Sequence, residues 1–105
     1  IGNTKNAFFM NQIFKVKESV QHLIPAVTHI DGTARIQTVS KQTNRRYYNL
    51  IKEFYKITNI PILINTSFNV KGEPNVEKPI DAINCFKKTD IDILVINNFL
   101  VQKCK

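Results

Sequence analysis

The sequence lacks three features that would assign it to a large class at once. No apolar run reaches the roughly 18 residues of a membrane-spanning helix, so no membrane role is expected. Its two cysteines form no CxxC pair and have no close histidine, so no metal site is expected. No secretory signal is recognisable, which favours reduced thiols and a cytoplasmic protein. With 105 residues, the remaining expectation is one globular domain spanning residues 1–105.

Acidic residues are also scarce, which leaves the chain strongly basic. It carries 15 Lys and Arg against 8 Asp and Glu, a net charge of +7. This favours anionic partners: nucleic acid, phosphorylated small molecules or an acidic protein surface. There is no run of five basic residues, as in a nucleic-acid-binding tail. The two doublets, Arg45-Arg46 and Lys87-Lys88, are expected on the solvated faces of helices.

Familiar catalytic motifs are missing as well. Nothing resembles a Ser-His-Asp set, a Walker loop or a cluster of metal ligands. The carboxylates of Asp31, Glu73, Glu77 and Asp81 have no spacing typical of paired acid–base catalysis.

Hydrophobic periodicity predicts an α/β protein of the α+β type, with helices packed on a mixed sheet. The clearest helix is 44–58, where Tyr47, Leu50, Ile51, Phe54 and Ile57 form one apolar stripe. A second helix is expected to begin at Pro79, and 17–24 to be a short helical turn or a loop. The expected strands are 7–16, 34–39, 62–64, 91–96 and 99–101, and 26–30 is expected to be extended. Turns are expected at Asp31-Gly32 and Asn97-Asn98.

The first candidate site follows the apolar strand expected at 62–64. Ligands bind beyond the carboxyl ends of strands in such sheets, and loop 65–74 begins there. Asn65, Thr66, Ser67, Asn69 and Lys71 together offer amides, hydroxyls and an ammonium group, which suit a phosphate or carboxylate. The alternative is a plain connection, because Asn, Ser, Gly and Pro also form turns.

The second candidate is the segment 28–35, in which Arg35 follows the turn at Asp31-Gly32. A guanidinium there can form paired hydrogen bonds with a phosphate or carboxylate. The alternative is a surface arginine paired with Asp31. His29 has the chemistry of a base, but a lone histidine in an apolar strand is more often structural.

Two long blocks of this sequence resemble one enzyme family. Residues 24–39, IPAVTHIDGTARIQTV, are similar to the "PAVTHVDGTARVQTV" block of the NodU/CmcH-type carbamoyltransferases. Residues 61–74, PILINTSFNVKGEP, are similar to their "PVLLNTSFNVRGEP" block. Shorter similarities follow at 79–86 and 92–100, so the resemblance runs in order over roughly residues 10–101.

The resemblance implies a C-terminal domain with a YrdC-like fold, an open twisted sheet with helices packed on it. In this family that domain joins ATP, expected with Mg²⁺, and carbamoyl phosphate into carbamoyl adenylate, with no covalently bound cofactor. An N-terminal domain of actin-like ATPase fold then transfers the carbamoyl group to a substrate hydroxyl. That domain, ATP and carbamoyl phosphate are therefore the expected partners.

The resemblance also implies roles for individual residues. Arg35 and Ser67 are expected to be catalytic. Arg35, Asn65, Thr66, Ser67, Asn69 and Lys71 are expected to bind ATP or carbamoyl phosphate, and no metal ligand is expected. Lys71 departs from the arginine usual in the family. The family's "GPRALG"-like segment is absent and the first residue is Ile1, so the chain is expected to be a partial domain, inactive alone.

Two alternatives remain open at this point. One is a non-catalytic interaction domain that docks onto the actin-like domain. The other is a basic RNA-binding module, for which the sequence gives little support because four aromatic residues are expected to be buried rather than displayed for stacking. These residues are Phe8, Phe9, Tyr47 and Phe54.

Overall fold

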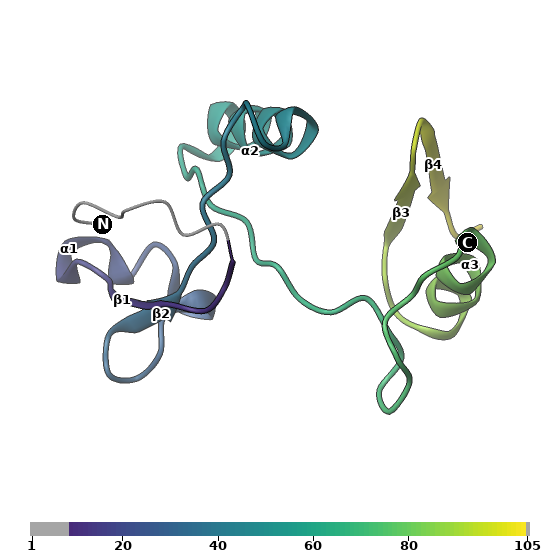
Figure 1. The fold of residues 1–105 in the computed structure, drawn as a ribbon, viewed down its shortest axis with the longest axis horizontal. Helices are drawn as coiled ribbons and strands as arrows, with labels where there is room; N and C mark the ends of the chain where they lie inside the picture. The colour runs from purple at the N-terminus through teal and green to yellow at the C-terminus, as the bar shows by residue number, and fades with distance from the viewer. Residues whose placement is uncertain (1–8, 105) are drawn as a thin grey trace. The chain divides into compact units, whose positions relative to one another are not determined.

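The computed structural model describes residues 9–104, and the chain divides into two compact units, Ile1–Ile64 and Asn65–Lys105. Each unit holds one small antiparallel sheet, β1–β2 in the first and β3–β4 in the second (Figure 1). Residues 9–104 form three α-helices beside these sheets, so the α/β class expected from the sequence is confirmed. The strands of the described residues pair as these two separate antiparallel sheets, and the single domain over 1–105 stays a prediction.

The N-terminal unit is built on the pairing of β1 (Ile13–Lys15) with β2 (Thr33–Arg35). Ile13 lies opposite Arg35 and Lys15 opposite Thr33. Val16 and Ala34 are its buried apolar residues, at 4% and 3% exposure. The short helix α1 (Glu18–Gln21) follows β1, where the sequence predicted a helical turn or loop.

The connection to β2 differs from the extended segment expected at 26–30. Pro25–Val27 is a turn of 3-10 helix, η1, with Pro25 in its first turn. The hydroxyl of Thr28 donates to the carbonyl of Ile24 at 2.9 Å. Proline in a first helical turn loses no intrahelical hydrogen bond, and the threonine hydroxyl satisfies a helix carbonyl. These local bonds outweigh the extended preference of the branched residues.

Helix α2 (Arg45–Thr58) confirms the helix predicted at 44–58. Asn44 caps its start, because its side-chain oxygen accepts from the main-chain N–H of Tyr47 at 3.1 Å. Asn59 ends it in the left-handed conformation, with φ of 62°. None of the fourteen residues of α2 is buried, although the helix carries an apolar stripe.

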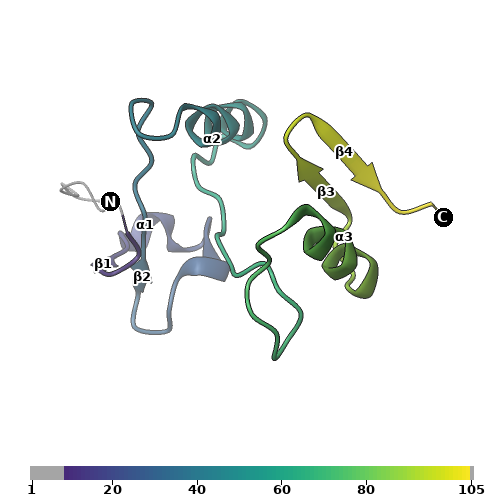
Figure 2. The same ribbon diagram turned by 45° about the vertical axis from the view of Figure 1, so that its right-hand side comes forward.

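The C-terminal unit packs α3 (Pro79–Lys88) against a hairpin of β3 (Ile93–Ile96) and β4 (Phe99–Gln102). Figures 1 and 2 both show α3 alongside this hairpin. The core between them is formed by Ala82, Phe86 and Leu94. Leu94 lies opposite Val101, which lines the same core. All three of these elements were predicted from the sequence.

Helix α3 starts as expected, with Pro79 in its first turn. The carboxylate of Asp81 accepts from the main-chain N–H of Lys78 at 3.3 Å, which satisfies a group that a helix start leaves open. Cys85 is 4% exposed and belongs to the buried side of α3, as predicted. The turn at Asn97-Asn98 is also confirmed, and Asn97 takes a positive φ of 52° there.

Three strand predictions are wrong at least in part. Strand β1 is shorter than 7–16, of which residues 7 and 8 lie outside the described chain, and β2 ends at Arg35 rather than at Val39. Segment 62–64 is not a strand. A strand needs a neighbour to pair its main chain, and none of the described segments supplies one here.

The expectation that four aromatic side chains are buried is also wrong, because none of the three that the structure describes is fully buried. Phe9 is 75% exposed, while Tyr47 and Phe54 are half-buried and Phe8 lies outside the described residues. Apolar periodicity indicates which side of a segment is apolar. It does not show whether the rest of the fold covers that side.

Candidate functional site

Loop 65–74 is anchored at its C-terminal side by the core of the C-terminal unit. The main-chain N–H of Val76 donates to the carbonyl of Phe68 at 2.9 Å. Both side chains pack against the Ala82–Phe86–Leu94 cluster. The intervening residues therefore project as a closed loop from a fixed base.

The tip of the loop is a tight turn. The N–H of Glu73 donates to the carbonyl of Val70 at 2.9 Å, and Gly72 has a φ of +86°. The side-chain amide of Asn69 donates to the carbonyls of Val70 and Glu73, at 2.9 and 3.1 Å. Both amide hydrogens of Asn69 are thus used within the loop, which leaves its side-chain oxygen as an acceptor.

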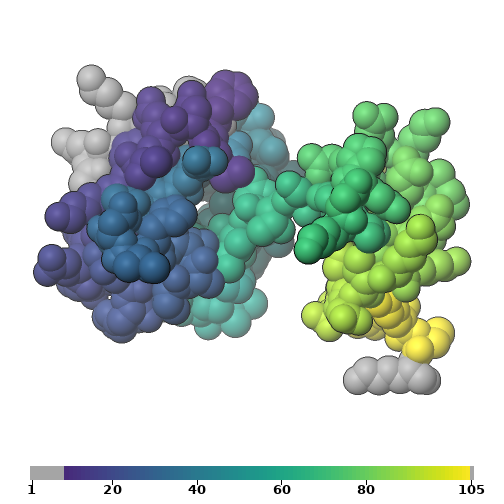
Figure 3. Space-filling view, turned by 90° about the horizontal axis from the view of Figure 1, so that it is seen from below, coloured from purple at the N-terminus to yellow at the C-terminus, as the bar shows by residue number. Residues whose placement is uncertain are grey.

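The hydroxyl and ammonium groups of the loop face solvent. Thr66, Ser67 and Lys71 are exposed, and the atoms of this stretch are among the green ones at the surface in Figure 3. Within the described residues, no hydrogen bond or ion pair involves the side chains of these three. Asn65 is exposed too, and has an interaction of its own. A ligand can therefore reach two hydroxyl donors and one cation without displacing an internal bond.

Five of the six predicted site residues thus share one loop of the C-terminal unit. The sixth, Arg35, belongs to the N-terminal unit, where it is the last residue of β2 and is exposed. The alternative interpretation, a pairing of Arg35 with Asp31, is not what the structure shows. Asp31 accepts instead from the hydroxyl and the main-chain N–H of Thr33, at 2.6 and 3.0 Å.

These bonds from Thr33 change the acidity of Asp31. The hydroxyl bond, and after it the main-chain bond, hold the pKa of the Asp31 carboxyl below its ordinary value, because both stabilise the carboxylate. Asp31 therefore serves the turn that precedes β2. The guanidinium of Arg35 is left available to an external anion.

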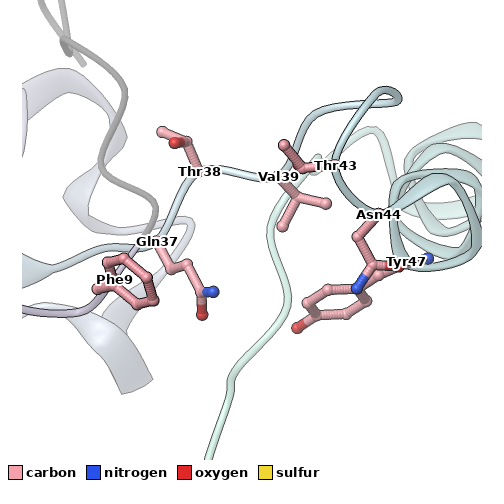
Figure 4. A pocket seen from close by; sticks show the side chains of 7 residues that line it. All are labelled: Phe9, Gln37, Thr38, Val39, Thr43, Asn44 and Tyr47. Atoms are coloured by element: carbon pink, nitrogen blue, oxygen red, sulfur yellow. Dashed lines mark hydrogen bonds between the residues drawn. The ribbon is translucent and has the colours of Figure 1, made fainter.

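The N-terminal unit also has a surface hollow that the sequence did not predict. Its volume is about 400 Å³. The side chains of Gln37 and Tyr47 extend toward the open space between their segments (Figure 4). The hydroxyl of Thr38 is buried there without a hydrogen-bond partner among the described residues. The lining residues are Phe9, Gln37, Thr38, Val39, Thr43, Asn44 and Tyr47.

Positive charge is distributed unevenly between the units. Residues 1–64 hold nine Lys and Arg against three Asp and Glu, whereas residues 65–105 hold six against five. Arg35 is therefore part of a strongly cationic unit, while Lys71 acts in a nearly neutral one. Long-range attraction of anions comes mainly from residues 1–64.

Two other features are absent from the described part of the chain. Residues 9–104 contain no group of three or more His, Cys, Asp or Glu side chains arranged to hold a metal ion. Among the same residues, none of the helices has the length and apolar content needed to cross a membrane.

Comparison with known proteins identifies the family of the chain. Residues 1–103 match the family model described as Carbamoyltransferase C-terminus. The chain is 49% identical over 100 residues to nodulation protein NolO of Bradyrhizobium diazoefficiens and 50% identical over 95 residues to nodulation protein NolNO of Sinorhizobium fredii. The chain therefore belongs to the carbamoyltransferase C-terminal family, as the resemblance of the two blocks indicated.

The matches cover nearly all of this chain but little of its relatives. They span 95% and 90% of the chain, against 18% of NolO and 14% of NolNO. An uncharacterised protein of Methanocaldococcus jannaschii is 46% identical over 103 residues, which are 98% of the chain and 20% of that protein. The chain thus spans about a fifth or less of the length of these relatives.

Proposed function

We propose that this chain forms part of the nucleotide site of a carbamoyltransferase, which binds ATP and carbamoyl phosphate and makes carbamoyl adenylate. The carbamoyl group is then transferred to a substrate hydroxyl by an N-terminal domain of actin-like fold. Membership of the carbamoyltransferase family supports the reaction class. The observation that carries the assignment of the site is the exposed Ser67 hydroxyl, unpartnered among the described residues, in a loop closed behind it by Asn69.

The proposed chemistry takes place in two steps. Water first cleaves carbamoyl phosphate to carbamate and inorganic phosphate. A carbamate oxygen then attacks the α-phosphorus of ATP, and the bond to the β-phosphate oxygen breaks, which releases pyrophosphate. Neither step requires a covalent bond to the protein. Catalysis of this kind rests on positioning and on stabilising negative charge.

Each loop residue has a distinct part in this proposal. The hydroxyls of Thr66 and Ser67 donate to phosphate oxygens, and Asn65 contributes its amide. Lys71 and Arg35 offset the repulsion between two anionic substrates. Asn69 acts mainly by holding the loop closed. Mg²⁺ would enter with ATP, bound to its phosphates.

The test is pyrophosphate release by the full-length protein in the presence of both substrates. Ser67→Ala and Arg35→Ala are expected to lower the rate about 100-fold or more, as loss of one transition-state donor does. Ser19→Ala, which alters an exposed serine of α1, is the matched control and is expected to keep the wild-type rate. Wild-type rates in both site variants would refute the site.

One observation favours a second candidate, a non-catalytic interaction domain. Helix α2 carries an apolar stripe, yet none of its residues is buried. Hydrogen exchange of the full-length protein separates the two candidates. Slower exchange over residues 65–73 on addition of ATP supports the nucleotide site. Exchange unchanged by ATP and carbamoyl phosphate, with α2 protected throughout, supports the interaction domain.

A further inference from the structure

The strand pair that presents Arg35 is short and is not joined by a tight turn. Strands β1 and β2 form three residue pairs. The long segment 16–32 connects them, whereas β3 and β4 meet at the two-residue turn Asn97-Asn98. A tight turn fixes the register of a strand pair, and a long connection does not. The register of β1 against β2 therefore depends on contacts made by segment 16–32.

The register decides on which face Arg35 lies. Along β2, Ala34 is buried at 3% exposure and Arg35 is exposed. Neighbouring residues of a strand point to opposite faces, so a shift of one residue in the pairing exchanges the two faces. Arg35 would then lie on the face that Phe14 and Ala34 now share. An anion bound on the exposed face would lose its cation.

Gln21, the last residue of α1, contacts the end of the strand pair that adjoins segment 16–32. The side-chain amide of Gln21 donates to the carbonyl of Val16 at 3.0 Å, and the N–H of Val16 donates to the carbonyl of Gly32 at 2.9 Å. The amide nitrogen of Gln21 also lies 2.9 Å from the position that a Cβ would take at Gly32. Gln21 thus meets the residue that follows β1 and the residue that precedes β2.

These contacts are specific to one register. Val16 is 4% exposed, Gly32 is buried and Gln21 is half-buried, so a carbonyl that lost this hydrogen bond would have little access to water. Gly32 has no side chain, which leaves room for the amide of Gln21. If the pairing shifted by one residue, Val16 would no longer meet Gly32, and Gln21 would lose one of its two contacts.

We propose that Gln21 is a positioning residue, which holds the register of β1 and β2 so that Arg35 faces an anionic substrate. This inference rests on the proposed role of Arg35 in binding ATP or carbamoyl phosphate. In the proposal Gln21 touches no substrate, so its effect on the reaction passes through Arg35. The effects of changing the two residues are therefore coupled rather than additive.

A double-mutant cycle in the full-length protein tests the coupling, with pyrophosphate release from ATP and carbamoyl phosphate as the readout. Gln21→Glu keeps the shape but removes the donor, and is expected to lower kcat/KM about tenfold or more. In the Arg35→Ala background, the same change is expected to alter kcat/KM less than about twofold. Gln42→Glu, at an exposed glutamine of the same unit, is the control for charge and is expected to keep the wild-type rate.

A second variant and a second measurement separate positioning from a folding defect. Gln21→Met removes the donor without adding charge, and is expected to cause a smaller loss with the same dependence on Arg35. Hydrogen exchange without ligands is expected to accelerate about tenfold at the Val16 amide in both variants, because the register is less firmly held. The amides of α3, in the other unit, are expected to exchange as in the wild type. Unchanged exchange at Val16 in both variants would overturn the proposal.

The possible failures give different results. Wild-type activity in Arg35→Ala would refute the proposed role of Arg35, and this inference with it. An impaired Arg35→Ala to which the loss from Gln21→Glu adds in full would refute only the positioning by Gln21. Faster exchange at Val16 with wild-type activity in Gln21→Glu would also refute it, and would leave Gln21 a purely structural role.

Discussion

The ammonium group of Lys103 lies 5.1 Å from the centre of the Phe86 ring. The same group donates a hydrogen bond to the main-chain carbonyl of Thr89, the residue that caps the C-terminus of α3. One side chain that follows β4 thus binds an aromatic face and the end of a helix. Both contacts favour a cation, since the ring face and the helix C-terminus are negative.

Replacement of this cation is expected to weaken the C-terminal unit. Lys103→Met keeps the length of the side chain but removes the charge, and should lower the free energy of unfolding by about 1 kcal/mol. This change in the free energy of unfolding is measured by urea denaturation of the full-length protein, with hydrogen exchange of the α3 amides as the readout. Lys52→Met, on exposed α2, is the control. Equal stability of the two variants would show that the Phe86 contact contributes nothing.

The bonds of Asn69 predict a role that differs from direct ligand contact. Asn69→Asp replaces an amide that donates to two carbonyls by a carboxylate that repels them. The turn should open at a cost of about 1–2 kcal/mol. Exchange of the Glu73 and Val76 amides, whose hydrogen bonds close the loop, should then accelerate about tenfold in the absence of ATP. Unchanged exchange with lost activity would instead indicate a ligand contact.

Two glycines with similar angles provide a matched comparison. Gly32 and Gly72 have φ of +78° and +86°, so alanine costs about 1–2 kcal/mol at either from backbone strain. At Gly32 the added methyl would also lie 2.9 Å from the amide nitrogen of Gln21, which donates to the carbonyl of Val16. Gly32→Ala should therefore be the more destabilising by about 1 kcal/mol in thermal or urea unfolding. The reverse order would contradict this geometry.

Lys71 allows a test of charge against shape. Lys71→Met should raise the Michaelis constant for ATP or carbamoyl phosphate by about tenfold, because one cation leaves the loop. Lys71→Arg should retain wild-type activity or improve it, since the guanidinium keeps the charge and adds paired donors. Lys41→Met is the control for loss of surface charge. Equal loss in the Met and Arg variants would argue against a charge role.

The acidity of Asp31 gives a prediction on pH. Thr33→Val removes the hydroxyl bond that lowers the pKa of Asp31, so that pKa should rise toward its ordinary value. Because the folded pKa is depressed, the stabilisation is present above the ordinary aspartate pKa and is lost as pH falls through the folded value. An NMR titration of the Asp31 carboxyl in both proteins measures it. An identical pKa in the variant would refute the assigned cause.

The sequence predicted best those elements whose signal is local. The stripe and caps of α2, the proline start of α3 and the Asn97-Asn98 turn all depend on residues within a few positions of one another. The strand prediction for 62–64 failed because strand formation is not decided locally. The side chains of this segment favour a strand, but a strand also needs a neighbour to pair with, and that neighbour is not specified by the residues of the segment itself.

The same distinction holds for the candidate site. Blocks 24–39 and 61–74 indicated the family, and the second located the polar loop; both are properties of contiguous residues. The sequence did not show that Asn69 donates both of its amide hydrogens within its own loop. Nor did it show that Asp31 accepts from Thr33 rather than pairing with Arg35. The side chains of Asn, Asp and Thr can each hydrogen-bond to several nearby groups equally well. The folded backbone determines which of these hydrogen bonds forms.

The environment of Gly72 leads to one last consequence. An L-side-chain carbon placed there meets no atom within 4 Å, so the loop has space for a larger residue. Position 72 requires a residue that adopts a positive φ, which is the region that D-amino acids favour. D-alanine, introduced by peptide ligation, should restrict the unfolded chain and stabilise the turn by about 0.4–1 kcal/mol, where its mirror image destabilises it. At this position stereochemistry, not volume, selects the residue.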